Sequence, residues 1–398
     1  MAIKKAAIIT LYENKNYGNK LQNYALQEIL KKEGLEVATI TNLQSEYKKT
    51  PSEVFYSLGL MKTCKFVFKK IIITFALESI AKKLLAILGI KKEKLKPQKI
   101  EERRIAKIKL FDKLIKKHHI TPLNENLSKI DKAYDLFVIG SDQIWNPNFL
   151  TNYKFDLGFF TLKNKKISYA ASIAVPVLTG KTAKTYKKAF NAFAEGMISV
   201  REFEGAKLIK DLTGKEVATV LDPTMLLDTS EWEKVLEEPE VKPKKKYLLT
   251  YILGDVSLER RNFIERVAEK YNLEIVNLLD ETQPEFYNTG VGEFLWFFKN
   301  AEVIFADSFH AGVFSILYEK PFYILNRAGM KQKHNMNSRF DTLLSAFELQ
   351  DRFLKEYDIE KVNFDVDYTK AGQILERRRE ESLNFLRNAL NKCGKPDK

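Results

Sequence analysis

Residues 301–325 read Ala-Glu-Val-Ile-Phe-Ala-Asp-Ser-Phe-His-Ala-Gly-Val-Phe-Ser-Ile-Leu-Tyr-Glu-Lys-Pro-Phe-Tyr-Ile-Leu. The apolar run Val303–Ala306 is typical of a buried strand, and Ala311–Tyr318 continues as a helix directly after His310. Lys320–Leu325 then supplies another strand. A strand, a helix and a strand in succession favour two parallel strands joined by a helical crossover.

The same alternation of strands and helices extends in both directions from this segment. Further strands are expected at Lys5–Leu11, Glu36–Ile40, Tyr134–Ile139, Lys166–Ser172, Gly196–Val200, Val217–Leu221, Tyr247–Leu253 and Glu274–Leu278. Helices are expected at Leu21–Glu33, Tyr186–Ala194, Leu258–Tyr271, Glu293–Asn300 and Gln373–Asn391. The pattern predicts an α/β protein with two doubly wound, Rossmann-like domains that face each other across a cleft.

The length of 398 residues exceeds what one hydrophobic core usually supports, so two domains are expected. The polar, proline-containing segment Leu236–Lys246 is typical of a boundary. We therefore predict an N-terminal domain over 1–235, a C-terminal domain over 240–370, and a terminal helix and tail over 371–398.

A lysine-rich segment interrupts the first domain at about 50–130 and is predicted to be a helical insertion. It concentrates the positive charge of a chain whose formal net charge is +14. Its longest uncharged run, Ile71–Leu77, is too short to cross a bilayer core of roughly 30 Å as a helix. The basic helices of 62–117 are a candidate for peripheral contact with an anionic membrane, while a solvated lysine-rich face or a helix packed on a sheet would show the same pattern. No nucleic-acid partner is expected.

Several classes of site are disfavoured by composition. Cys64 and Cys393 are the only cysteines, and they permit neither a disulfide framework nor a four-cysteine zinc site. His118 and His119, expected in a basic helix, and the isolated His334 do not suggest a metal site. The chain has no phosphate-binding Walker loop and no dinucleotide-type glycine run after its first strand. With no secretory signal at its start, a cytoplasmic location is expected.

His310 is the leading candidate for chemistry, because it stands between a buried strand and the start of a helix. Helix N-termini attract anions, and an imidazole titrates near neutral pH. A histidine that merely caps the helix or fills space is the alternative. Three cations, Arg201, Lys320 and Arg327, stand near strand ends, where they would meet an anionic substrate.

Five segments resemble the polysaccharide pyruvyl transferase family, and they occur in the order of that family. They are Asn16–Gln27, Gly140–Pro147, Ile198–Glu202, Leu221–Thr224 and Asp307–His310. The resemblance implies a fold like that of two-domain inverting glycosyltransferases of the GT-B type. It also implies transfer of a pyruvyl group from phosphoenolpyruvate to two hydroxyls of a sugar, as a cyclic ketal, during synthesis of cell-surface polysaccharides.

The resemblance also implies roles for individual residues. The implied catalytic residues are His310, Arg201 and Asp142. His310 would be the general acid, and Arg201 would bind an anionic group of the donor. Asp142 or Glu202 would accept the proton of the sugar hydroxyl. The second domain would bind the donor and the first domain the acceptor, a sugar or lipid-linked saccharide. The donor set is Arg201, Ser308, His310, Lys320 and Arg327, and the acceptor set is Asn16, Gly18, Asn19, Gln22, Ser141, Asp142 and Gln143. Phosphoenolpyruvate is a co-substrate, and no cofactor or metal is implied.

One position departs from the family pattern. Characterised members carry an arginine two residues before the histidine, where this chain has Ser308. Either Arg201, Lys320 or Arg327 supplies that charge, or the donor is another compound. Two other functions stay open: a glycosyltransferase that uses a nucleotide sugar, and a non-catalytic, membrane-associated protein of polysaccharide assembly.

Overall fold

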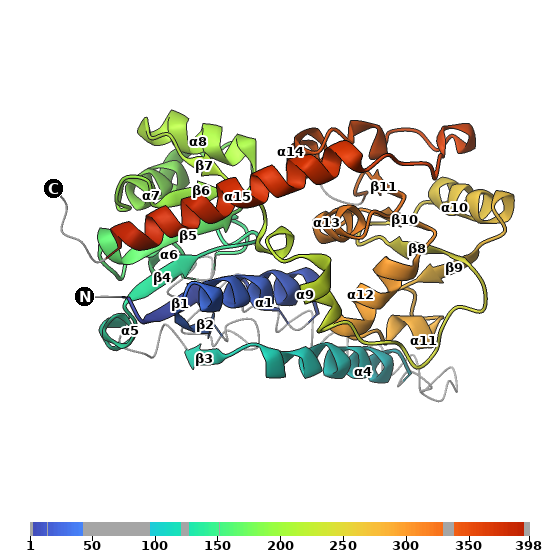
Figure 1. Cartoon of the computed structure of the whole chain (residues 1–398), viewed down its shortest axis with the longest axis horizontal. Coiled ribbons are helices and arrows are strands. Elements are labelled where there is room, and N and C mark those ends of the chain that lie inside the picture. Colours follow the sequence, from blue (N-terminus) through green and yellow to red (C-terminus); the bar gives the residue numbers. More distant parts are fainter. Residues whose placement is uncertain are drawn as a thin grey trace, which may run out of the picture.

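The computed structural model describes residues 3–13, 15–42, 96–120, 127–150, 152–328 and 338–393. Within them the chain forms two parallel sheets with helices between the strands, as the sequence predicts. Figure 1 shows the sheets beside one another, the first at the left and the second at the right. Most of the insertion expected over about 50–130 lies outside the described residues, including the apolar run Ile71–Leu77.

The first sheet has the strand order β3-β2-β1-β4-β5-β6-β7, and every pairing in it is parallel. Its strands are β1 (Lys5–Ile9), β2 (Glu36–Asn42), β3 (Lys117–Ile120), β4 (Leu136–Ile139), β5 (Lys166–Ala171), β6 (Ile198–Val200) and β7 (Ala218–Thr219). The central β4 is buried along its whole length, because helices cover both faces of a parallel sheet. The strand order reverses between β1 and β4, and such switch points are where open α/β sheets bind ligands.

The second sheet has the order β12-β11-β10-β8-β9 and is also entirely parallel. Its strands are β8 (Tyr247–Tyr251), β9 (Glu274–Asn277), β10 (Val303–Ala306), β11 (Phe322–Leu325) and β12 (Phe353–Leu354). Here the order reverses between β8 and β10, so the segment after β10, which contains His310, follows a strand at the switch point.

The helices alternate with the strands along the chain. They are α1 (Tyr17–Lys32), α4 (Lys96–Leu110), α5 (Leu127–Ala133), α6 (Tyr153–Asp156), α7 (Gly180–Asn191), α8 (Phe203–Thr213), α9 (Thr229–Glu233), α10 (Leu258–Lys270), α11 (Pro284–Tyr287), α12 (Val291–Asn300), α13 (Phe309–Leu317), α14 (Ser338–Ala346) and α15 (Thr369–Lys392). Among these described helices, none is both long enough and apolar enough to cross a membrane.

Helix α15 connects the two halves of the molecule, and in Figure 1 it runs across both of them. Near its start, the Tyr368 hydroxyl donates to the carbonyl of Lys320 in the second half. Farther along, Arg379 donates to the carbonyl of Met225, and Arg387 forms an ion pair with Glu33 of α1. The C-terminal helix thus packs against the first half of the chain.

Several local predictions are wrong. Helix α7 begins at Gly180 rather than Tyr186, and α15 begins at Thr369 rather than Gln373. His118 and His119 were expected in a basic helix, but they lie in β3, which forms the edge of the first sheet. His119 and Thr41 share a hydrogen bond of 2.6 Å there, across the β2–β3 pair. Helix α1 also begins four residues earlier than Leu21, because the Asn16 side chain caps it by accepting from the backbone N–H of Asn19 at 3.3 Å.

Candidate active site

The predicted site residues, except Lys320, gather where the carboxyl ends of the strands of the two sheets meet. The start of α1, the loop after β4 and the junction of β6 with α8 contribute from the first sheet. The junction of β10 with α13 contributes from the second. Because parallel strands end at the same edge of a sheet, segments distant in sequence come together at this place.

His310 lies inside the first turn of α13, and only 7% of it is exposed. Its Nε2 atom is 3.8 Å from Oδ2 of Asp222 and has no hydrogen-bond partner. The ring packs against the backbone of α1 at Gly18, so closely that a Cβ at that position would lie 2.1 Å from Nδ1 of His310. Glycine at position 18 therefore makes room for the imidazole.

Arg201 lies between three carboxylates of the first half and is 3% exposed. Its Nη1 donates to Oδ2 of Asp222 at 2.8 Å. Its Nη2 is 3.5 Å from Oδ1 of Asp142, and its Nε is 3.7 Å from Oε1 of Glu202. The guanidinium also stacks on the ring of Phe309, 4.1 Å from the ring centroid, and this contact joins Arg201 to the start of α13.

Asp222 links the arginine to the histidine. Its Oδ2 also accepts from the Ser141 hydroxyl at 3.0 Å, and its Oδ1 accepts from the backbone and hydroxyl of Thr224 at 3.0 and 2.7 Å. Sequence reasoning placed Asp222 in a family segment but gave it no role. The available signal was an acidic residue before a proline at the end of a predicted strand.

The residues expected to bind the acceptor form a network of internal hydrogen bonds. Gln22 accepts from the backbone N–H of Ser141 at 3.2 Å and donates to the Thr10 hydroxyl and the Asn19 carbonyl. The Asn19 amide donates to the carboxylate of Asp142. These bonds hold the loop after β4 against α1 and position Asp142, whose φ is 58°.

The remaining two residues of the acceptor set also make local hydrogen bonds. Asn16 caps α1, and Gln143 accepts from the side chain of Asn146 at 2.8 Å. Both are only partly buried, so they retain access to solvent.

The residues expected to bind the donor separate into two groups. Ser308 is the buried N-cap residue of α13. Arg327, after β11, donates to the carbonyl of Asp307 at 2.6 Å and stays beside the junction. Lys320 precedes β11, so it lies at the amino ends of the strands, opposite the carboxyl ends where His310 lies. The charges that affect its pKa are those of Glu302 and Lys299. The structure therefore does not bring Lys320 to His310.

Burial and charge set the protonation of the central groups. Burial lowers the pKa of His310, and Asp222 and Asp142 only partly offset that effect. Burial by itself would raise the pKa of Asp222. The positive charges of protonated His310 and of Arg201 outweigh this effect, so the pKa of Asp222 is lowered. Burial raises the pKa of Glu202 despite the nearby Arg201. A carboxyl group whose pKa is raised is suited to accept a proton.

Several buried side-chain atoms at this junction have no hydrogen-bond partner among the described residues. They include His310 Nε2, Arg201 Nε, Glu202 Oε2, Asn19 Oδ1 and Arg327 Nε. Buried polar groups are nearly always paired, so a cluster of unpaired ones calls for an explanation. A polar substrate that contacts these atoms would provide it.

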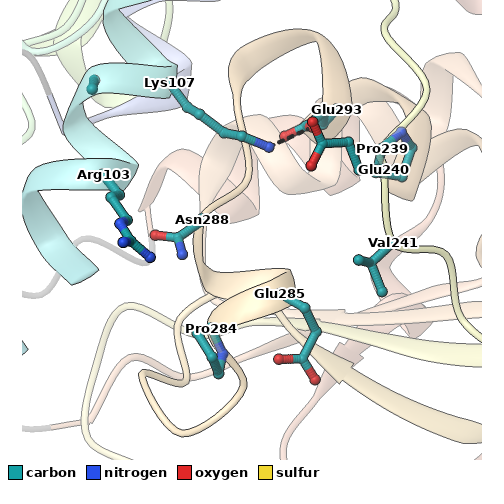
Figure 2. A pocket seen from close by; sticks show the side chains of 10 residues that line it. Arg103, Lys107, Pro239, Glu240, Val241, Pro284, Glu285, Asn288 and Glu293 are labelled. Carbon is teal, nitrogen blue, oxygen red and sulfur yellow. Dashed lines mark hydrogen bonds and ion pairs between the residues drawn. The ribbon is translucent and has the colours of Figure 1, made fainter. Parts of the chain in front are cut away.

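A separate pocket of about 330 Å³ lies between α4, the segment 239–241 and α11 (Figure 2). Lys107 of α4 points across it to Glu293 of α12, at 2.8 Å. Arg103 and Asn288 also line it. None of its lining residues belongs to the cluster around His310, so we place the active site by its chemistry rather than at this hollow.

A comparison with protein families matches residues 16–329 to polysaccharide pyruvyl transferase. The chain belongs to this family. The matched range includes His310, Arg201, Asp142 and Asp222, and it excludes α14 and α15. The resemblance found in the five sequence segments is thereby confirmed, and the protein is a transferase of polysaccharide biosynthesis. A search of curated proteins found no match.

Solved structures with a related arrangement include UDP-N-acetylglucosamine 2-epimerases. A putative enzyme from Listeria monocytogenes has 11% identity and a TM-score of 0.44, with 100% of this chain and 99% of that chain covered. The enzyme from Neisseria meningitidis, bound to UDP-GlcNAc, has 9% identity and a TM-score of 0.45, with 98% of each chain covered.

Proposed function

We propose that this protein transfers a pyruvyl group from phosphoenolpyruvate to two hydroxyls of a sugar in a cell-surface polysaccharide precursor, forming a cyclic ketal. The observation that carries the proposal is the position of His310. Its unpaired Nε2 is buried beside Asp222 and Arg201, at the meeting of the two sheet edges. A proton donor, an anion-binding cation and carboxylates are thus within one small volume.

In the proposed first step, protonated His310 transfers a proton to the methylene carbon of the donor. The adjacent carbon becomes an oxocarbenium-like centre, which one sugar hydroxyl attacks while Glu202 or Asp142 accepts its proton. The bond from this carbon to the phosphate oxygen then breaks, and the second hydroxyl adds. Overall, one hydroxyl proton ends in the new methyl group, the other leaves with phosphate, and two carbon–oxygen bonds form.

The charge around His310 supports this role. Burial lowers its pKa, so an additional negative charge nearby is needed to hold the proton at neutral pH. Asp222 supplies one such charge at 3.8 Å, and an anionic donor would supply more. Binding of the donor would therefore raise the pKa of His310 and ready it for proton transfer.

The test is phosphate release from phosphoenolpyruvate in the presence of a panel of nucleotide-linked and lipid-linked saccharides. We expect release that depends on a saccharide and is lost in His310→Gln. His118→Gln, in the edge strand β3, is the matched control and should retain activity. Release of a nucleoside diphosphate from a nucleotide sugar, without any reaction of phosphoenolpyruvate, would instead establish the glycosyltransferase alternative.

We also propose that the protein acts in the cytoplasm, in peripheral contact with the membrane where lipid-linked acceptors reside. The support is the net charge of +14 and its concentration in the lysine-rich segment. Flotation of the full chain with vesicles tests this. It should float with vesicles containing anionic phospholipid and not with neutral ones, and equal flotation with both would contradict an electrostatic contact.

A further inference from the structure

Helix α13 begins at the junction of the two halves without a capping hydrogen bond. Its N-cap residue is Ser308, a residue type whose hydroxyl usually accepts a hydrogen bond from the first turn, but here the side chain accepts none. The N–H group of Gly312 donates to the Ser308 carbonyl at 3.2 Å. Among the described residues, no acceptor lies within hydrogen-bond reach of the backbone N–H groups of Phe309, His310 and Ala311.

This uncapped helix start is buried. Ser308 and the three residues after it are all less exposed than the surface of the protein, and Ser308 itself is 7% exposed. First-turn N–H groups that are neither capped nor open to water need another partner. Because the N-terminal end of a helix carries partial positive charge, the partner that fits best is an anion.

Polar side chains around the helix start also lack partners. Nε2 of His310, in the first turn, and Nε of Arg201 are buried and make no hydrogen bond to a described residue. The Arg201 guanidinium lies 4.1 Å from the ring centroid of Phe309, the first residue of α13. The nearby carboxylate of Asp222 is paired with Arg201 at 2.8 Å. Unpaired donors from both halves are therefore found at the same helix start.

The charges that precede the helix leave this position open to an anion. Arg327 donates to the carbonyl of Asp307, one residue before the N-cap, at 2.6 Å. The Asp307 carboxylate accepts from the backbone N–H groups of Leu253 and Gly254 at 2.6 and 2.8 Å. It is thus bound to the loop after β8 and does not cap α13.

We propose that the start of α13 binds the phosphate group of the donor, through the backbone N–H groups of Phe309, His310 and Ala311 and the hydroxyl of Ser308. A hydroxyl and a helix start then take the place of the arginine that characterised members of the family carry at this position. The identity of the donor as phosphoenolpyruvate rests on the proposed function. The phosphate site does not require it, because a nucleotide sugar also carries phosphate.

Helix α10 provides a matched control, because it also begins after a serine. The Ser257 hydroxyl accepts from the backbone N–H of Arg260 at 3.2 Å, so this helix is capped. Ser257→Ala should therefore lower the thermal midpoint and leave ligand binding unchanged. Ser308→Ala removes no cap, so it should weaken ligand binding and leave the thermal midpoint of the unliganded protein nearly unchanged.

The backbone N–H groups are tested by Phe309→Pro. Proline has no N–H and is tolerated at the first position of a helix. The residue before a proline must be extended, and Ser308 is extended, with φ −111° and ψ 133°. Phe309→Ala is the control, because it removes the same ring and its contact with Arg201 but keeps the N–H group. The pair therefore differs by one hydrogen-bond donor.

The experiment is calorimetry of the full-length wild type and these four variants with phosphoenolpyruvate, inorganic phosphate, uridine diphosphate and pyruvate, with thermal unfolding to show that each is folded. We expect Ser308→Ala to weaken binding of phosphoenolpyruvate and inorganic phosphate by about 10- to 100-fold, the worth of a hydrogen bond to a charged group. Phe309→Pro should bind them more weakly than Phe309→Ala by a similar factor. Pyruvate, which has no phosphate, should bind Ser308→Ala as it binds the wild type.

The outcomes separate this inference from the proposed function. Unchanged affinity of folded Ser308→Ala for the phosphate ligands, equal affinity of the two Phe309 variants, or a loss confined to pyruvate would overturn the phosphate site, while the proposed donor stands if the wild type binds phosphoenolpyruvate. If the wild type binds uridine diphosphate but not phosphoenolpyruvate, and Ser308→Ala weakens that binding, the phosphate site stands and the proposed donor fails. If no phosphate ligand binds the wild type, both fail.

Discussion

The two sheet edges that meet at the active site differ in the charges they contribute. The edge of the first sheet supplies the carboxylates Asp142, Glu202 and Asp222, with Arg201 between them. The second half supplies the histidine, and the charges beside it there are Arg327 and its partner Asp307. The proposed acid, His310, and the proposed proton acceptors, Asp142 and Glu202, therefore lie on different halves of the molecule.

This difference indicates that the chemistry depends on the contact between the halves. At the site itself, the halves are linked by the packing of His310 against Gly18 and by its proximity to Asp222, both in the first half. Arg201, expected to bind the donor, also belongs to the first half. The predicted donor set already includes Arg201 of the first domain, so we expect both halves to contact the donor.

Removing the proton donor of the second half should have the largest effect. We expect His310→Gln to reduce kcat by about 10²- to 10⁴-fold, the usual contribution of a general acid. Steady-state assays of phosphate release would measure it, with His118→Gln remaining within about twofold of the wild type. Full activity of His310→Gln would show that another group donates the proton.

Disturbing the contact between the halves should have the next largest effect. In Gly18→Ala, the new methyl group would lie 2.1 Å from the imidazole, so the ring must move. A displacement of about 1 Å at a reacting group can cost about 100-fold in rate. Gly372→Ala in α15 adds a methyl group with nothing within 4 Å and should leave kcat unchanged. Equal activity of the two variants would contradict the close packing.

Removing the negative charge that faces His310 should alter the pH profile. Asp222 favours the protonated imidazole, so Asp222→Asn should lower the pKa of His310 further. A reaction that requires the protonated form is lost as the pH rises through that pKa. The alkaline limb of activity should therefore move to lower pH. Thr224→Val, which removes one hydrogen bond from Asp222 but no charge, should leave the limb in place.

The smallest effect is expected from replacing Lys320, which lies at the amino ends of the strands of the second sheet, away from His310. Lys320→Gln should change the KM for phosphoenolpyruvate by no more than about twofold, because the lysine does not reach His310. A tenfold rise in this KM, with unaltered thermal stability, would return Lys320 to the donor site.

The alternation of strands and helices could be predicted from the sequence because it is a local, periodic signal. Val303–Ala306 is a strand at the predicted residues, and the strand Ile198–Val200 lies within the predicted run Gly196–Val200. Helix α1 starts earlier than predicted, since its first turn is polar and buried in the site rather than apolar. His118 and His119 were misplaced because the pairing of β3 with β2 is a tertiary contact that local pattern does not report.

The sequence predicts where the candidate site lies better than it predicts which residues form it. His310, Arg201 and Asp142 were found from strand ends and family segments, and the structure brings them together. Asp222 reaches the site through contacts between distant elements, and no spacing in the sequence indicates these contacts. The hydrogen bonds of Gln22 and Asn16 likewise show that polar residues in a motif can hold the site together instead of facing the substrate.

The most direct test of the central claim is the isotopic content of the product formed in D₂O from phosphoenolpyruvate and a saccharide that supports turnover. If His310, exchanged with solvent, protonates the methylene carbon, mass spectrometry and NMR should find a pyruvyl ketal whose methyl group carries one deuterium. A product without deuterium in the methyl group, or a transferred group that retains the methylene carbon unprotonated, would contradict the assignment of His310 as the general acid.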